Sequence, residues 1–136
     1  MRGFRSGVAV LVAGGLLVAC MPQAQEEEVS GRALYVDLCA SCHGDTGRGD
    51  GPAAAGLGAP IPDLTVLARN NRGEFPLVAV MSHIDGYTRT DEGDPMPEFG
   101  PLLDGQLVPV DTGDGVLTPT PAPLFALAEY LQTLQR

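Results

Sequence analysis

One short segment, Cys39-Ala40-Ser41-Cys42-His43, limits what this chain can fold into more than any other feature of its sequence. Two thiols three positions apart at the end of a helix lie on one face, where they can add to the two vinyl groups of a haem. The imidazole of the next residue then reaches the iron. We therefore predict one covalently attached haem c, held by Cys39 and Cys42, with His43 as an iron ligand.

Other uses of these residues fit the sequence less well. A tetrahedral zinc site would need a fourth ligand, and the chain holds no second C-x-x-C or H-x-H unit to supply one. A thioredoxin-like redox pair would follow a strand in a βαβ unit, whereas the residues before Cys39 have the pattern of a helix. A structural disulfide would leave His43 without a purpose.

The composition makes a bulky cofactor plausible, because the chain alone can bury only a modest core. Of its 136 residues 44% are apolar and none is tryptophan, while 18 glycines and 12 prolines predict many loops. A single small domain of this kind often depends for its stability on a metal, a disulfide or a large cofactor. We expect the loops to fold around the haem.

The first 28 residues differ from the rest. Two arginines precede an uncharged apolar stretch, residues 7–19, which is short for a transmembrane helix and typical of an export signal. Its last residues before Cys20 resemble the lipobox of bacterial lipoproteins, in which cleavage leaves the cysteine as a lipid-modified amino terminus. We predict a signal peptide at 1–19, lipid attachment at Cys20, and a flexible acidic tether at 20–28.

This signal predicts a location outside the cytoplasm, where haem is attached to such motifs. We expect the mature protein at the periplasmic side of a bacterial membrane, held there by a lipid anchor. An ordinary signal peptide with an incidental cysteine would instead give a soluble periplasmic protein.

The mature chain is strongly acidic. Without residues 1–19 it has six arginines, no lysine and 17 acidic residues, which give a formal net charge of −11. Each contact to a phosphate of nucleic acid needs a cation, so we expect no nucleic acid partner. The negative charge serves either solubility or the choice of a partner with a basic surface.

Capping residues and apolar spacing predict the elements of the first half. Ser30 can cap a first helix that ends at the cysteine motif. Residues 44–62 have no apolar period and are rich in glycine, alanine and proline, which predicts an irregular loop beside the cofactor. A short helix begins at Asp63 or Thr65 and ends near residues 70 and 71.

Two more helices and a hairpin are expected in the second half. A third helix extends from Glu74 to Asp85, with Pro76 in its first turn. Short β-prone runs around an Asp-rich turn predict a small hairpin near 107–118, with Pro109 on a free edge. The aspartates lack the full spacing of a calcium loop, so they are interpreted as turn residues. Thr120 with Pro121 opens a final helix with one leucine stripe.

Several residues of the first and last helices stand at characteristic intervals. They are Gly31, Tyr35 and Cys39 in the first helix and Leu127 and Tyr130 in the last. The segments Cys42-His43-Gly44, Gly47-x-Gly49-Asp50-Gly51-Pro52 and Pro62-Asp63-Leu64-Thr65 are also distinctive. With these motifs, the chain after residue 28 resembles the class I c-type cytochromes, especially small bacterial members with one haem.

The resemblance implies an all-α domain over 29–136, folded around one covalent haem, with the hairpin as an insertion. It also implies that the carbonyl oxygen of Pro62 accepts a hydrogen bond from the second ring nitrogen of His43 and so fixes the ring. Pro60 is the alternative acceptor.

The second axial ligand has three candidates. Met81 falls on the apolar stripe of the third helix, which indicates packing, and His83 near the end of that helix is typical of a surface histidine. Met96 lies between two prolines that exclude a helix, so it stands on an extended loop and can point at a metal. We predict Met96, and the family's methionine loop looks similar.

A haem iron closed by histidine and methionine favours electron transfer over catalysis. We therefore expect a monohaem carrier, not an enzyme, that passes single electrons between redox partner proteins. A haem subunit of a periplasmic dehydrogenase or oxidase complex would share every motif. A haem-based ligand sensor would lack a firm second axial ligand.

Overall fold

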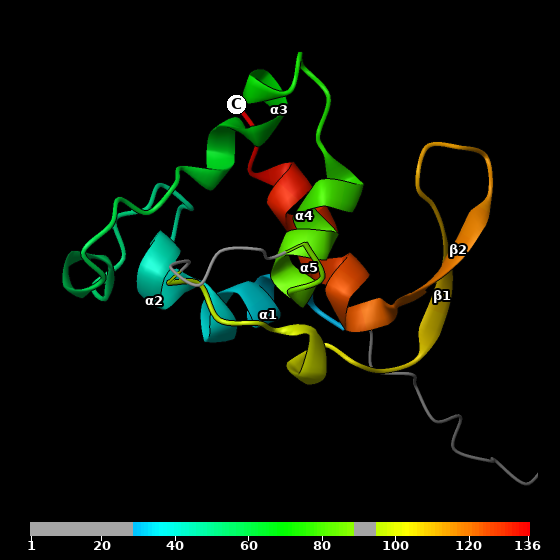
Figure 1. Cartoon of the computed structure of the whole chain (residues 1–136), viewed down its shortest axis with the longest axis horizontal. Helices are drawn as coiled ribbons and strands as arrows, with labels where there is room; N and C mark the ends of the chain where they lie inside the picture. Colours follow the sequence, from blue (N-terminus) through cyan, green and yellow to red (C-terminus); the bar gives the residue numbers. More distant parts are fainter. Residues whose placement is uncertain (1–28, 89–94) are drawn as a thin grey trace, which may run out of the picture.

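The computed structural model of the chain describes residues 29–88 and 95–136 (Figure 1). The predicted signal peptide, Cys20 and the tether lie outside the described residues. The described part contains five α-helices, three short 3-10 turns and one two-stranded antiparallel sheet. None of its helices is long and apolar enough to span a bilayer.

The cysteine motif lies where the first helix ends and the second begins. α1 (Gly31–Leu38) begins at Ser30, whose hydroxyl accepts a hydrogen bond from the backbone N–H of Ala33, so the predicted cap is confirmed. The chain turns at Cys39 and continues as α2 (Ala40–His43). Gly44 ends α2 with a positive φ of 77°, a conformation that glycine adopts without steric cost.

The first and last helices cross at a glycine. α5 (Ala122–Thr133) packs across α1, and a Cβ atom at Gly31 would overlap the backbone carbonyl of Ala126. The rings of Tyr35 and Tyr130 meet at this crossing with centroids 5.3 Å apart. The crossing forms the centre of the core, where Tyr35 and Leu127 are fully buried.

The middle of the chain contains short elements and one helix that begins later than predicted. They are η1 (Ala54–Gly56), η2 (Leu64–Val66), α3 (Leu67–Asn70) and α4 (Leu77–Asp85). Asp63 caps η2 with its carboxylate, as one of the two predicted starts. The prediction that the third helix starts at Glu74 is wrong: Pro76 has a ψ of 67°, which is not helical, so α4 starts only after it.

The predicted hairpin is present, with longer strands than expected. After η3 (Gly100–Leu102), β1 (Leu107–Asp111) pairs antiparallel with β2 (Leu117–Pro121), so that Pro109 faces Pro119. Thr120 lies in β2 and does not cap α5, which corrects the predicted helix start. In the turn, the Asp111 carboxylate accepts hydrogen bonds from two backbone N–H groups, as expected for turn residues.

Candidate functional site

The structure brings the side chains of the cysteine motif to one wall of a cavity. Cys39 is 7% exposed and His43 is 8% exposed, while Cys42 is half-buried. The helical hydrogen bond from the His43 N–H to the Cys39 carbonyl, 2.9 Å long, places the thiols and the imidazole on the same side. Both thiols are free.

Burial also argues against a thiol redox site. Burial, with a smaller contribution from the neighbouring Cys42, raises the pKa of the Cys39 thiol to about 11. Reactive cysteines in C-x-x-C redox motifs have the opposite property, a lowered pKa that produces thiolate at neutral pH. The geometry therefore fits thiols that are held in place for attachment better than a dithiol that exchanges electrons itself.

The glycine-rich loop folds back along the outer side of the motif. The backbone N–H groups of Gly49, Gly51 and Ala53 donate to carbonyl oxygens within the motif at 2.8–3.1 Å. Gly51 approaches so closely that a Cβ atom there would overlap the motif's backbone. The loop thus leaves the cysteine and histidine side chains to face the cavity, as predicted for residues 44–62.

One polar contact of this region is not evident from the sequence. The hydroxyl of the fully buried Tyr35 donates a hydrogen bond to the carbonyl of Gly44, directly after the motif. Burial raises the pKa of Tyr35 to about 12, so the phenol keeps its proton and remains a donor. Helical spacing identified Tyr35 as a packing residue and gave no signal for its hydroxyl.

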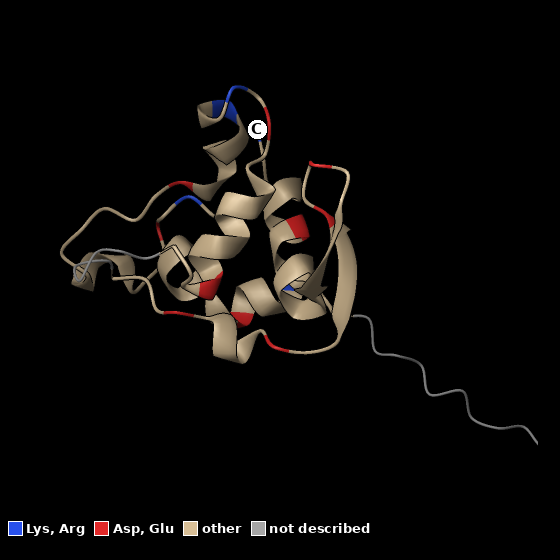
Figure 2. Cartoon of the chain, turned by 45° about the vertical axis from the view of Figure 1, so that its right-hand side comes forward, with Lys and Arg blue, Asp and Glu red and all other residues tan. Residues whose placement is uncertain are grey.

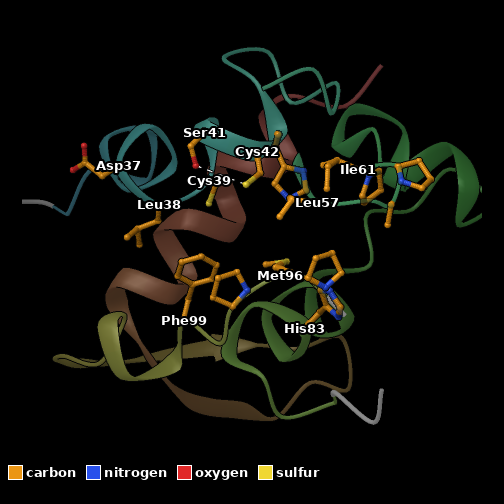
Figure 3. A pocket seen from close by; sticks show the side chains of 16 residues that line it. Asp37, Leu38, Cys39, Ser41, Cys42, Leu57, Ile61, His83, Met96 and Phe99 are labelled. Atoms are coloured by element: carbon orange, nitrogen blue, oxygen red, sulfur yellow. Dashed lines mark hydrogen bonds between the residues drawn. The ribbon is translucent and has the colours of Figure 1, made fainter. Parts of the chain in front are cut away.

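Two cavities have some of their lining residues in common, and Figure 3 shows the first of the two. Their volumes are about 460 and 470 Å³, and their linings are mainly apolar. This is the size range of pockets that hold cofactors. The residues common to both cavities are Cys39, His43, Pro62, His83 and Met96.

The structure distinguishes the three candidates for the second axial ligand by where each side chain lies. Met81 is buried in the core and lines neither cavity, which confirms its interpretation as a packing residue. Met96 is half-buried and lines both cavities, across from Cys39 and Cys42 (Figure 3). His83 is exposed, as expected, but it also lines both cavities, which its sequence position did not indicate.

The carbonyl of Pro62 is the backbone acceptor that acts on His43. Burial lowers the pKa of His43, the Pro62 carbonyl opposes this effect, and His83 adds to it. The Nδ1 atom of His43 is buried, yet among the described residues no hydrogen bond to it meets normal geometric limits. Pro60 lines only one of the two cavities, so its position favours Pro62 as the acceptor.

A haem fits the residues that are present. The two free thiols are one helical turn apart, a buried imidazole follows them, and a thioether lies across an apolar cavity. The orphaned Nδ1 of His43 is also the atom that a ring bound to a metal through its other nitrogen would offer to an acceptor. Among the described residues, no cluster of three or more metal-binding side chains offers an alternative.

Comparison with known proteins gives one match. A family model described as Cytochrome c matches residues 29–135, which includes every described residue but the last. No curated protein and no solved structure matches the chain significantly.

Proposed function

The chain belongs to the cytochrome c family, whose members hold haem c covalently and carry electrons, and on this premise we propose that it passes single electrons between redox proteins with one haem. In this proposal Cys39 and Cys42 hold the haem, and His43 and Met96 are its axial ligands. The single observation that supports it best is that the two cavities meet at Cys39, His43 and Met96.

The bound haem supplies a metal that changes its charge by one electron without changing its bonds. The chain's own residues set the conditions for that change. His43 stays neutral as a buried ring, because burial lowers its pKa, and it can therefore offer a lone pair. The Met96 thioether lies across the cavity from the cysteine motif and would fill the second axial position. The apolar walls of the cavity exclude water. Both effects favour the less charged, reduced state.

The proposal predicts how the purified holoprotein behaves. We expect reversible one-electron reduction in an optical redox titration, at the positive potential typical of histidine and methionine ligation. Carbon monoxide added to the reduced protein should bind slowly or not at all, since both axial positions are filled. Rapid binding of carbon monoxide by the wild-type protein would contradict the carrier and favour a ligand sensor.

The charge distribution supports a partner with a basic surface. Acidic residues are spread over the described domain (Figure 2). Three of the five described arginines, Arg69, Arg72 and Arg136, lie on or near α3 and at the carboxyl terminus, and the other two lie elsewhere. Among the described residues, no arginine lines either cavity, and the exposed Asp37 lies at one of them. A basic partner would therefore be steered toward the haem site and not away from it.

We further propose that the protein acts at the periplasmic side of a bacterial membrane, attached through lipid on Cys20. The support is the lipobox-like sequence and the acidic tether that follows it. A single acyl chain binds membranes only weakly, whereas several chains anchor a protein stably.

Replacing Cys20 with serine should release a soluble haem protein from the membrane fraction. Fractionation followed by haem staining, with intact mass measured in parallel, checks both the release and the loss of lipid mass. Gln23→Ser in the tether is the matched control and should leave the protein with the membranes. Wild-type protein that is soluble and carries no added lipid mass would contradict the anchor.

A further inference from the structure

The segment that follows Pro62 is too short to hold its own position. It consists of Asp63, the 3-10 turn η2 and the four-residue helix α3. Helical pieces of this length are unstable alone, because nucleation costs more entropy than a few hydrogen bonds return. Contacts with the rest of the chain must therefore fix where this segment lies.

The last two residues of the chain supply those contacts. The side-chain amide of Gln135 donates to the carbonyl of Leu64 at 2.9 Å and to that of Leu131 at 2.8 Å, and its oxygen accepts from the N–H of Ala68 at 2.9 Å. Gln135 thus links the start of η2 and the first turn of α3 to α5. Leu131 is 4% exposed, so the anchor point belongs to the core.

Arg136, the next residue, adds a second set of contacts, to Thr65 and Asp63. Its backbone N–H donates to the carbonyl of Thr65 at 3.0 Å, and its Nε donates to the Thr65 hydroxyl at 2.7 Å. A terminal guanidinium nitrogen also lies 3.0 Å from the Asp63 carboxylate. The guanidinium is half exposed, so the ion pair itself contributes little, and the hydrogen bonds matter mainly because they fix geometry.

These contacts determine the direction of the Pro62 carbonyl. The peptide group between Pro62 and Asp63 is planar, so the carbonyl turns with the backbone of Asp63. The proline ring fixes φ on the other side. Holding residues 63 to 65 therefore leaves the carbonyl little freedom, and this carbonyl is the backbone acceptor that acts on the His43 ring, whose Nδ1 is buried.

We propose that Gln135 and Arg136 are positioning residues, which together form a clamp that holds the Pro62 carbonyl toward His43. Through this contact they set the reduction potential of the electron carrier. The inference rests on the proposed function, because it concerns the axial role of His43. A closer acceptor makes the imidazole a stronger donor to the metal, which favours the oxidised state. Losing the clamp should therefore raise the reduction potential.

Gln135→Ala is the decisive variant because it removes the Gln135 contacts of the clamp without changing the net charge of the protein. In the holoprotein we expect the reduction potential to rise relative to wild type. The Nδ1–H proton of His43, followed by NMR in the reduced protein, should exchange about tenfold faster, which corresponds to the loss of one hydrogen bond. Gln132→Ala removes the same side chain one turn earlier on α5, at a position whose side chain, unlike that of Gln135, makes no hydrogen bond to the segment among the described residues, and should change neither quantity.

Arg136→Ala tests the same idea with an opposing charge effect. Removing a positive charge by itself stabilises the oxidised state and lowers the potential. Arg69→Ala on α3 measures that effect alone, so the potential of Arg136→Ala should lie above that of Arg69→Ala. Arg136→Lys keeps the charge without the planar fork and should restore the exchange rate only in part.

These measurements distinguish a failure of the clamp proposal from a failure of the proposed electron-carrier function. A lower melting temperature in Gln135→Ala, with potential and Nδ1–H exchange unchanged, would show a purely structural role and overturn the clamp, while the carrier stands. Equal potentials in Arg136→Ala and Arg69→Ala would also overturn it. Wild-type protein without histidine ligation would overturn both proposals.

Discussion

Replacing Cys39 and Cys42 together with alanine is expected to abolish covalent haem and leave the chain largely unfolded. The described domain has few fully buried large side chains, namely Tyr35, Leu103 and Leu127. Without haem, the two apolar cavities would remain as unfilled space against this small core. Native domains are stable by only about 5–15 kcal/mol, so a loss of this kind can remove the folded state entirely.

Haem staining after denaturing electrophoresis and far-ultraviolet circular dichroism measure the two expected losses. Ser41→Ala is the matched control within the motif, because Ser41 is exposed and makes only a 3.8 Å contact to the Cys42 sulfur. It should keep both haem and fold. A double alanine variant that is well folded without haem would show that the core does not depend on the cofactor.

Replacing Met96 with alanine should keep covalent haem but open the site. Met96 is the one described methionine that lines the cavities, and its loss would leave an axial position for other ligands. We expect the weak far-red band of methionine bound to ferric iron to disappear, the reduction potential to fall, and carbon monoxide to bind rapidly to the reduced protein. Absorption spectra and redox titration measure all three changes.

Two control variants test the alternatives that the structure separates. Met81→Ala should lower the stability by about 2–5 kcal/mol through lost packing, since Met81 is buried in the core, and should leave the far-red band intact. His83→Ala should change the spectrum little, although His83 also lines both cavities. A far-red band that survives in Met96→Ala but vanishes in Met81→Ala would assign the ligand to the core methionine. Loss of an axial ligand in His83→Ala alone would assign it to His83.

Local chemistry accounts for the elements that could be predicted from the sequence. The Ser30 and Asp63 caps, the stop of α4 at Gly86 and the cysteine motif at a helix end each depend on residues close together in the chain. The start of α4 was predicted wrongly because proline suits the first turn of a helix, whereas Pro76 has a non-helical ψ of 67° and stands before α4. Thr120 was misplaced because the same residue type suits a cap and a strand.

The candidate site was harder to predict, because it is built from contacts between residues that are distant in the sequence. The periodicity of apolar residues gives no information about such contacts. Gln135 and Arg136 bind residues about 70 positions earlier, and nothing in the leucine stripe before them indicates those partners. His83 was interpreted as a surface histidine because its helix position was visible while the cavity beside it was not. The motif residues and Met96, which the structure places at one cavity, could be singled out because haem attachment and the proline-flanked loop impose short sequence patterns.

The two prolines that face each other in the hairpin have a consequence for self-association. Leu107 and Leu117 are 58% and 62% exposed on this two-stranded sheet, and open strand edges with apolar side chains invite pairing between copies. Pro109 and Pro119 form a cross-strand pair without any N–H group, so the donors missing there are those that would point outward from each strand. Both edges therefore lack a donor at the same level, which disfavours their extension into an intermolecular sheet. Proline at these positions protects an acidic, loop-rich domain from edge-to-edge aggregation.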